Sequence, residues 1–318
     1  MSELDETVFL PGAGLEETRQ FNHDLIRKLE SFPDPWSSTP VENRQKRLQG
    51  IGPFPAPEFS ERAQNLTIEG PRGPLVLRLL TPTSGPSNRA FLHIHGGGWM
   101  YGSAAYQDAR LQEMADRADC NVFSVEYGLA PESPYPAAPD DCECAARWLT
   151  GEGARLHQLE QFAIGGESAG AHLSVVTLLR MRDRHKTMPF NWAVLVAGCY
   201  DLGLTPSAAS FGEERLLLTT RDIKNFSRNY LGNHANTRLS DVSPLYADLR
   251  NLTSAMFIVG TRDALLDDTL FMHSRWIASN NSATIKIFAE GCHVFNTFPL
   301  KISDECNKMI DDYLFITL

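Results

Sequence analysis

The sequence predicts an α/β fold in which a mostly parallel, eight-stranded sheet is covered by helices on both faces. From residue 89 onward, short apolar runs typical of buried strands alternate with longer segments of helical periodicity. A β-hairpin pattern at residues 64–80 precedes them and adds two antiparallel strands. Repeated strand–helix units of this kind build parallel sheets, whose strands are buried on both sides.

The first 62 residues are predicted to lie outside the sheet. Residues 16–30 have an amphipathic helical pattern that gathers Phe21, Leu25 and two further apolar residues on one face. Prolines between positions 33 and 57 then divide the chain into a short helix and an extended link. These residues are therefore expected to form a separate N-terminal layer.

The remaining elements follow in chain order. After the hairpin strands at 64–69 and 75–80, strands are predicted at 90–95, 121–127, 161–164, 192–197, 255–259 and 284–288, with helices at 106–118, 140–149, 171–182, 267–279 and 303–313. A segment at 204–231 is longer than an ordinary connection and is predicted to be a helical insertion. The chain is accordingly divided into N-terminal cap helices and linker (1–62), a core in two parts (63–203 and 236–318) and a cap insertion (204–235).

The composition favours a protein that acts on small molecules over one that binds nucleic acid or a membrane. The net charge of −10 provides no basic surface for nucleic acid or anionic lipid. The N-terminal segment is acidic, and no apolar window reaches the length of a membrane span, so we expect a cytoplasmic protein without stable membrane insertion. The six cysteines contain no C-x-x-C pair, which favours reduced thiols and no metal site.

A strand, a tight turn and a helix centre on Ser168. The apolar run 161–164 stops at two glycines, and helical periodicity begins at Ala171. Between them, residues 166–170 read Gly-Glu-Ser-Ala-Gly, the G-x-S-x-G pattern in which a strained turn lifts a serine hydroxyl above the sheet edge. The helix points its free N–H groups and positive dipole end at whatever Ser168 attacks. Ser168 is predicted to be a nucleophile; the alternative is a helix-capping serine.

A second motif, His95-Gly96-Gly97-Gly98-Trp99, directly follows a predicted strand. Acyl transfer needs N–H donors aimed at the developing oxyanion, and residues without side chains let the backbone approach closely. H-G-G-G is the loop that accompanies the serine elbow in lipases and esterases. His95 is expected to brace this loop by hydrogen bonding and not to react. The alternative is a flexible glycine turn.

Together these motifs resemble the hormone-sensitive-lipase-like family of α/β-hydrolase carboxylesterases, over roughly residues 65–298. The resemblance rests on motifs at 95–98, 126–138, 166–170, 243–245 and 260–263. It implies an α/β-hydrolase fold with a helical cap drawn from the N-terminus and the insertion. It also assigns the oxyanion donors to the N–H groups of Gly97, Gly98 and Ala169. Members of this family often dimerise through the edge of the last strand, so a homodimer is a further expectation.

A nucleophilic serine needs a base and an orienting acid. In this fold both partners follow the serine at the ends of late strands, the acid before the histidine. His293 follows the last predicted strand and a Glu-Gly turn, whereas the other late histidines lie in polar segments or within a predicted helix. Asp263 follows the preceding strand, while Asp267 and Asp268 are expected to begin the next helix. We predict His293 as the base and Asp263 as the acid.

Three features depart from the family pattern. The segment from Glu290 to His293 is one residue shorter than usual. Gly128 stands where the family has an arginine. Glu167 stands where aspartate is commoner, and it is expected either to pair with a nearby cation or to face water.

We therefore predict a serine hydrolase that cleaves small to medium-chain carboxylic esters through an acyl-serine, with no cofactor and no metal. Phe21, Leu25, Leu217 and Phe226 of the two cap segments are predicted to line the acyl pocket. The alternative is that these faces only seal the core. A lactonase, deacetylase or formamidase could use the same triad. A small-molecule receptor on this fold is a further alternative, although such receptors lack the catalytic histidine.

Overall fold

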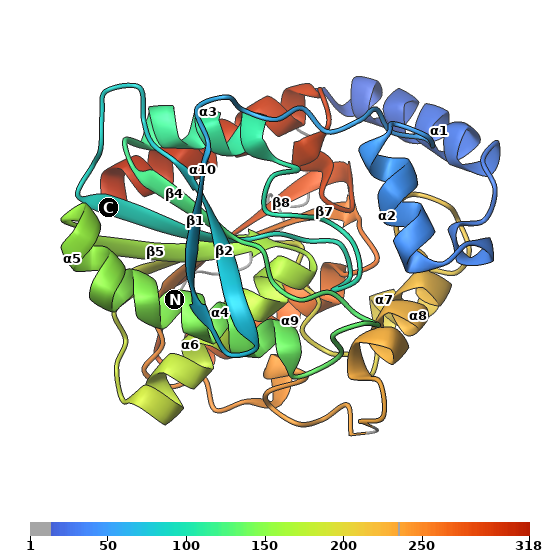
Figure 1. Ribbon diagram of the computed structural model, residues 1–318. Coiled ribbons are helices and arrows are strands. Elements are labelled where there is room, and N and C mark those ends of the chain that lie inside the picture. Colours follow the sequence, from blue (N-terminus) through green and yellow to red (C-terminus); the bar gives the residue numbers. More distant parts are fainter. Residues whose placement is uncertain (1–13, 235) are drawn as a thin grey trace.

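In the computed structural model, which describes residues 14–234 and 236–318, one eight-stranded sheet runs through the molecule (Figure 1). Its strands are β1 (Gln64–Gly70), β2 (Gly73–Leu80), β3 (Arg89–Ile94), β4 (Asn121–Val125), β5 (Gln161–Glu167), β6 (Trp192–Val196), β7 (Ser254–Arg262) and β8 (Ala283–Cys292). Their spatial order is β1-β2-β4-β3-β5-β6-β7-β8, with β2 antiparallel to both neighbours and all other pairs parallel. The predicted mostly parallel sheet is confirmed.

Helices cover both faces of the sheet (Figure 1). On one face lie α3 (Asp108–Ala118) and α10 (Lys301–Thr317); on the other lie α4 (Ala137–Trp148), α6 (Ala169–His185) and α9 (Leu266–Ala278), while the short α5 (Ala154–His157) follows α4. Neighbouring strand residues alternate between the two apolar layers: Phe91 packs with α3 and α10, and Leu92 packs with α4 and α6. Burial on both sides explains why the central strands are continuous apolar runs.

Four further helices belong to the N-terminal segment and the insertion, the two segments predicted to form the cap: α1 (Leu15–Glu30), α2 (Pro40–Leu48), α7 (Pro206–Ser210) and α8 (Thr220–Leu231). A threonine directly precedes each of the helices α2 and α8, and its side chain forms a capping box with the residue three positions on. The N-terminal and inserted segments lie side by side (Figure 1), because the Trp36 indole N–H donates to Asp222 over 2.6 Å and the Trp36 and Phe226 rings are 5.2 Å apart.

Some sequence predictions fall on residues that the structure does not describe. The acidic N-terminal segment, from which a cytoplasmic location was inferred, lies within residues 1–13, and Ala235 belongs to the predicted insertion. Over the described ranges, no helix combines the length and the apolarity needed to cross a bilayer.

The last strand differs from the prediction. A strand ending at residue 288 and a separate Glu-Gly turn were expected, but β8 continues to Cys292. The irregularity lies within the strand pair: Glu290 has φ 60°, and the β7–β8 register shifts between Gly260 and Arg262. A Cβ on Gly260 would lie 2.0 Å from the carbonyl oxygen of Gly291, so glycine lets the strands continue past the bulge.

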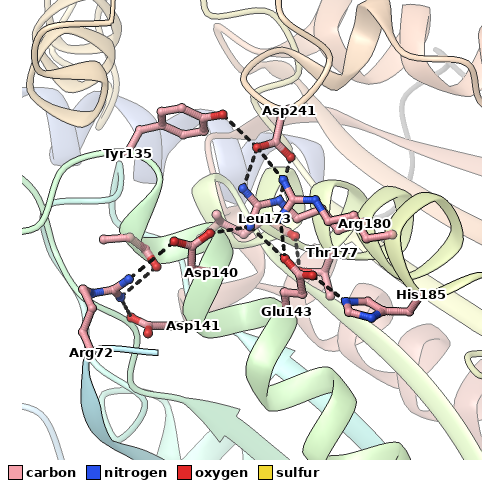
Figure 2. A network of polar contacts seen from close by, with 12 residues as sticks. Arg72, Tyr135, Asp140, Asp141, Glu143, Leu173, Thr177, Arg180, His185 and Asp241 are labelled. Atoms are coloured by element: carbon pink, nitrogen blue, oxygen red, sulfur yellow. Dashed lines mark hydrogen bonds and ion pairs between the residues drawn. The ribbon is translucent and has the colours of Figure 1, made fainter. Parts of the chain in front are cut away.

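A buried arginine connects the helices α4 and α6 (Figure 2). The Arg180 guanidinium of α6, 3% exposed, contacts Asp140 and Glu143 of α4 and binds Asp241 with Nε 2.6 Å from Oδ1. The Tyr135 hydroxyl donates to the same Asp241 over 2.8 Å. Burial favours the neutral form of Asp241, but the hydrogen bonds and charge of Arg180 outweigh this effect and lower its pKa. The network anchors the chain segment at Asp241.

Candidate active site

Ser168 lies on the turn between β5 and α6. Its backbone has φ 55° and ψ −120°, and its N–H donates to Val196 O over 2.8 Å. The flanking glycines are required by close packing, since a Cβ on either Gly166 or Gly170 would lie 1.9 Å from the carbonyl oxygen of Ile94. The end of β3 therefore leaves no room for a side chain at either residue that flanks the turn.

The structure brings His293 and Asp263 to this serine. His293 Nε2 lies 2.9 Å from Ser168 Oγ, and His293 Nδ1 lies 3.0 and 2.9 Å from the two carboxylate oxygens of Asp263. A carboxylate only accepts hydrogen bonds, so Nδ1 carries the proton and Nε2 is left to accept from the serine hydroxyl. Asp263 is 3% exposed and also accepts the Leu265 N–H over 2.8 Å, which holds its carboxylate in place.

The glycine loop after β3 lies beside the serine turn. Gly97 and Gly98 have φ 117° and 60°, and a Cβ on Gly97 would lie 2.3 Å from the carbonyl oxygen of Tyr101. Within residues 14–234 and 236–318, no acceptor takes the N–H of Gly97 or Gly98. The N–H of Ala169, in the first turn of α6, has no intrahelical partner. These three groups remain available to an oxyanion.

Glu167, the residue before the serine, ties the two motifs together. Its Oε1 accepts the Gly96 N–H over 2.8 Å and a hydrogen bond from Gln107, while its Oε2 lies 3.1 Å from His93 Nε2. Glu167 is 8% exposed, so of the two alternatives the one in which its side chain faces water is wrong. Burial alone would raise its pKa, but His93 and the Gly96 N–H lower it below the usual range. No sequence signal indicated His93, which lies inside a buried strand.

His95 braces the loop, as expected for a structural histidine. Its Nδ1 lies 2.9 Å from Gly96 O, and its ring stacks on Tyr127 with centroids 4.2 Å apart. The Tyr127 hydroxyl donates to His95 O over 2.9 Å.

The N-terminal helix supports the strand that leads to His293. Asn22 of α1, 2% exposed, donates from Nδ2 to Glu290 O over 2.8 Å, and Arg19 Nε donates to the Glu290 carboxylate over 3.1 Å. The Glu290 N–H in turn donates to Thr261 Oγ1 over 2.9 Å. Sequence reasoning missed these contacts, because helical periodicity identifies an apolar face but not a polar partner on a distant strand.

Gly128 binds a carboxylate that also binds an arginine of another segment. The Gly128 N–H donates to Asp141 Oδ2 over 2.9 Å, and the Arg72 guanidinium, from the turn between β1 and β2, binds the same oxygen. Burial raises the pKa of Asp141, an effect that Arg72 opposes. The loop at Gly128 is therefore tied to α4 through Asp141 and, through the same carboxylate, to the turn between β1 and β2.

A cavity of about 420 Å³, here the cap cavity, lies between the two cap segments. Leu217 and Phe226 line it together with Leu29 of α1. The Phe226 ring also packs on Gly98, since a Cβ on Gly98 would lie 2.5 Å from the nearest ring atom. The Phe226 side chain therefore lies between the cap cavity and the glycine loop. Two further predicted lining residues belong elsewhere: Phe21 packs on Phe298 with ring centroids 5.0 Å apart, and Leu25 is buried in the core cluster beneath α1.

The cysteines are unpaired, and burial suppresses the ionisation of the one beside the histidine. All six are free thiols. Cys292 is fully buried, which raises its pKa to about 12. In the described part of the chain, no three His, Cys, Asp or Glu side chains are grouped in a way that could hold a metal ion.

Comparison with known proteins gives consistent matches. A family model for the alpha/beta hydrolase fold matches residues 91–297. Esterase LipI of Mycobacterium tuberculosis is 32% identical over 277 residues, which are 84% of this chain and 83% of that protein. A solved esterase of the bacterial hormone-sensitive lipase family superposes with a TM-score of 0.79 at 26% identity, covering 95% of this chain and 98% of that one. A Pyrobaculum calidifontis esterase superposes with a TM-score of 0.76 at 25% identity, covering 95% and 92%.

Proposed function

Because the chain belongs to the hormone-sensitive-lipase branch of the α/β-hydrolases and is therefore a serine ester hydrolase, we propose that Ser168, His293 and Asp263 are its catalytic triad. The observation that carries this proposal is the continuous hydrogen-bonded chain from Ser168 Oγ through the imidazole to the Asp263 carboxylate. Order and spacing match the roles of nucleophile, base and orienting acid.

The reaction proceeds in two halves. His293 Nε2 takes the Ser168 hydroxyl proton as Oγ attacks the ester carbonyl, and Asp263 stabilises the imidazolium that forms. The N–H groups of Gly97, Gly98 and Ala169 stabilise the oxyanion of the tetrahedral intermediate. His293 then donates its proton to the leaving alcohol, which leaves an acyl-serine. Water then attacks the acyl carbonyl as it loses a proton to the same imidazole, and the imidazolium returns this proton to Ser168 Oγ as the acid leaves.

We propose that the cap cavity receives the acyl chain. Its wall includes Leu217, Phe226 and Leu29, and the Phe226 ring separates it from Gly98 of the glycine loop. Esters of small to medium chain length are therefore the expected substrates. In this proposal the cap comprises residues 1–62 and 204–235, and the core comprises residues 63–203 and 236–318.

The test is hydrolysis of a ladder of p-nitrophenyl esters from acetate to decanoate, with a lactone and a formyl amide beside it. Ester turnover well above both comparison substrates supports the carboxylesterase, whereas faster lactone or formyl-amide turnover indicates the alternative hydrolase. If the folded protein hydrolyses none of these substrates, the small-molecule receptor becomes the better interpretation.

Substitutions test the triad on the best ester. Ser168→Ala and His293→Ala should each lower kcat on the order of a million-fold, and Asp263→Asn by about ten-thousand-fold through the wrong tautomer. His273 of α9 is the matched control, being a second buried histidine outside the site. Activity of His293→Ala close to that of His273→Leu would refute the assignment of the base.

We further propose a cytoplasmic protein. The six free thiols support this location, since thiols persist in reducing compartments. Fractionation of producing cells, with an antibody to the chain, tests it, and recovery from the medium or the membrane pellet would contradict it.

We also propose a homodimer that pairs through β8. This strand forms one edge of the sheet, and an unpaired edge offers N–H and C=O groups to a second copy. Light scattering of the purified protein should give twice the monomer mass, and the monomer mass would contradict the proposal.

A further inference from the structure

Trp99, the residue directly after the glycine loop, is held on several sides. It is 2% exposed and has φ 59°, a left-handed conformation that is unfavourable for a tryptophan. Its carbonyl oxygen accepts the Ala130 N–H over 2.8 Å. Its ring stacks on Tyr230 of α8, with centroids 4.5 Å apart and planes 21° from parallel. Such a conformation persists only where the surroundings determine it.

His172 of α6 makes a polar contact with the Trp99 ring. The indole N–H donates to His172 Nδ1 over 3.2 Å, and His172 Nε2 lies 2.8 Å from Val242 O. Because Nδ1 accepts from Trp99, the ring proton is on Nε2 and donates to the carbonyl. Burial lowers the pKa of His172 to about 4, so near neutral pH the ring is neutral and each nitrogen has one partner.

Both ends of this contact are firmly attached. His172 lies four residues after Ser168 on the helix that begins at the serine turn. Val242 follows Asp241, the carboxylate that Arg180 and Tyr135 hold in Figure 2. Trp99 is thus connected to the nucleophile helix and to an anchored segment through a single imidazole.

We propose that His172 is a positioning residue for the oxyanion loop: by holding the Trp99 indole, it sets where the backbone of Gly97 and Gly98 lies relative to Ser168. The inference rests on the proposed oxyanion role of that loop. Glu167 holds the start of the loop at Gly96, and Trp99 holds its end. Between these two attachments the Gly97 carbonyl oxygen accepts the N–H groups of Met100 and Tyr101 over 3.2 and 2.9 Å, so Trp99 lies inside this turn and a shift of its backbone moves the N–H groups of Gly97 and Gly98 with it.

Two substitutions of His172 separate this role from simple packing. In His172→Asn, the amide oxygen lies near the position of Nδ1 and can still accept from Trp99. In His172→Gln, the amide lies near the position of Nε2, so the contact with Val242 remains and the contact with Trp99 is lost. Trp99→Phe removes the same hydrogen bond from the other side and keeps an aromatic ring against Tyr230. Thr177→Val is the matched control, because Thr177 is a buried polar residue of α6 that bonds only within the helix, to Leu173 O over 2.7 Å.

The measurements are kcat and KM on p-nitrophenyl acetate. His172→Gln and Trp99→Phe should each lower kcat by roughly ten- to a hundredfold with KM nearly unchanged, since small displacements of stabilising groups have effects of that size. The double variant should lose no more than either single variant, because both remove one contact. His172→Asn and Thr177→Val should stay within about threefold of the wild type.

The indole N–H resonance of Trp99, identified by its loss in Trp99→Phe, reports the hydrogen bond without any substrate. It should move in His172→Gln and stay in His172→Asn. A His172→Gln protein with near-normal kcat would overturn the proposal, as would losses that multiply in the double variant. If the wild type hydrolyses no ester, the proposed function fails, while an unmoved resonance in His172→Gln would separately refute the contact.

Discussion

Truncating Leu217 to alanine should selectively weaken the hydrolysis of longer esters. Leu217 lines the cap cavity from the segment between α7 and α8, and none of the triad residues lines that cavity. The prediction concerns the ratio of kcat/KM for hexanoate and acetate esters, because both substrates undergo the same chemistry at Ser168 and differ only in the acyl chain.

The magnitude follows from the surface that the chain buries. A hexanoyl chain has four more methylenes than an acetyl group, and each fully buried methylene contributes about 0.8 kcal/mol. Full burial would therefore favour hexanoate by about 3 kcal/mol, roughly 200-fold, and partial burial by ten- to a hundredfold. Leu217 forms one wall of the cavity, so its truncation should remove about 1 to 1.5 kcal/mol and lower the ratio about tenfold.

Leu25→Ala is the matched control, since it removes the same side chain from the other cap segment at a position outside the cavity. It should lower the free energy of unfolding by about 2 to 5 kcal/mol and leave the hexanoate-to-acetate ratio unchanged. Steady-state kinetics on both esters, with urea unfolding of both variants, measures these effects. An unchanged ratio in Leu217→Ala, or an equal change in both variants, would refute the assignment of the cavity as the acyl pocket.

Four further predictions concern groups around the site. Glu167→Gln should lower kcat about tenfold with little change in KM, because the Gly96 N–H loses a charged acceptor; a normal kcat contradicts this. Asn22→Ala should lower kcat on both esters equally by freeing Glu290 O, whereas a change in their ratio contradicts this. Because burial raises the pKa of Cys292 to about 12, iodoacetamide at pH 8 should leave activity intact, and inactivation with mapped modification of Cys292 opposes the prediction. Arg180→Met should cost about 3–5 kcal/mol of unfolding free energy. Because the pKa of Asp241 is lowered in the folded protein, its ionised carboxylate stabilises the fold above about pH 4, and this stability is lost as the pH falls through the pKa of the folded state. Urea titrations from pH 7 to 3 should therefore show a flatter pH dependence of the free energy of unfolding in Arg180→Met than in the wild type.

Local patterns predicted the frame of the molecule. The central strands are apolar runs because helices cover both faces, so periodicity alone identified each of them. Ser168 and the glycine loop were identified because the chemistry requires particular residues at short spacing. Helix α6 begins at Ala169, two residues earlier than predicted, because the serine turn passes directly into the helix. Boundaries of this kind depend on turn geometry, which the pattern of apolar residues does not record.

Contacts between distant segments could not be predicted in the same way. Nothing in the sequence pairs Asn22 with Glu290, His172 with Trp99, or Arg72 with Asp141. Hydrophobic periodicity describes a single helix or strand, and each of these pairs joins two elements that are far apart along the chain. The bulge in β8 was missed for a related reason. It depends on the close approach of Gly260 and Gly291 in adjacent strands, which only the register of the folded sheet determines.

The N-terminal helix shows why these distant contacts matter for the interpretation of experiments. Leu29 lines the cap cavity, while Asn22, two turns earlier on the same helix, holds the strand that ends at His293. Removing residues 1–45 would therefore remove a wall of the pocket and a support of the base together, and an equal loss on short and long esters would not show that the segment is mere packing. The two roles lie on different side chains, so only point substitutions separate them. Leu217→Ala changes the pocket and leaves the support, and Asn22→Ala changes the support and leaves the pocket.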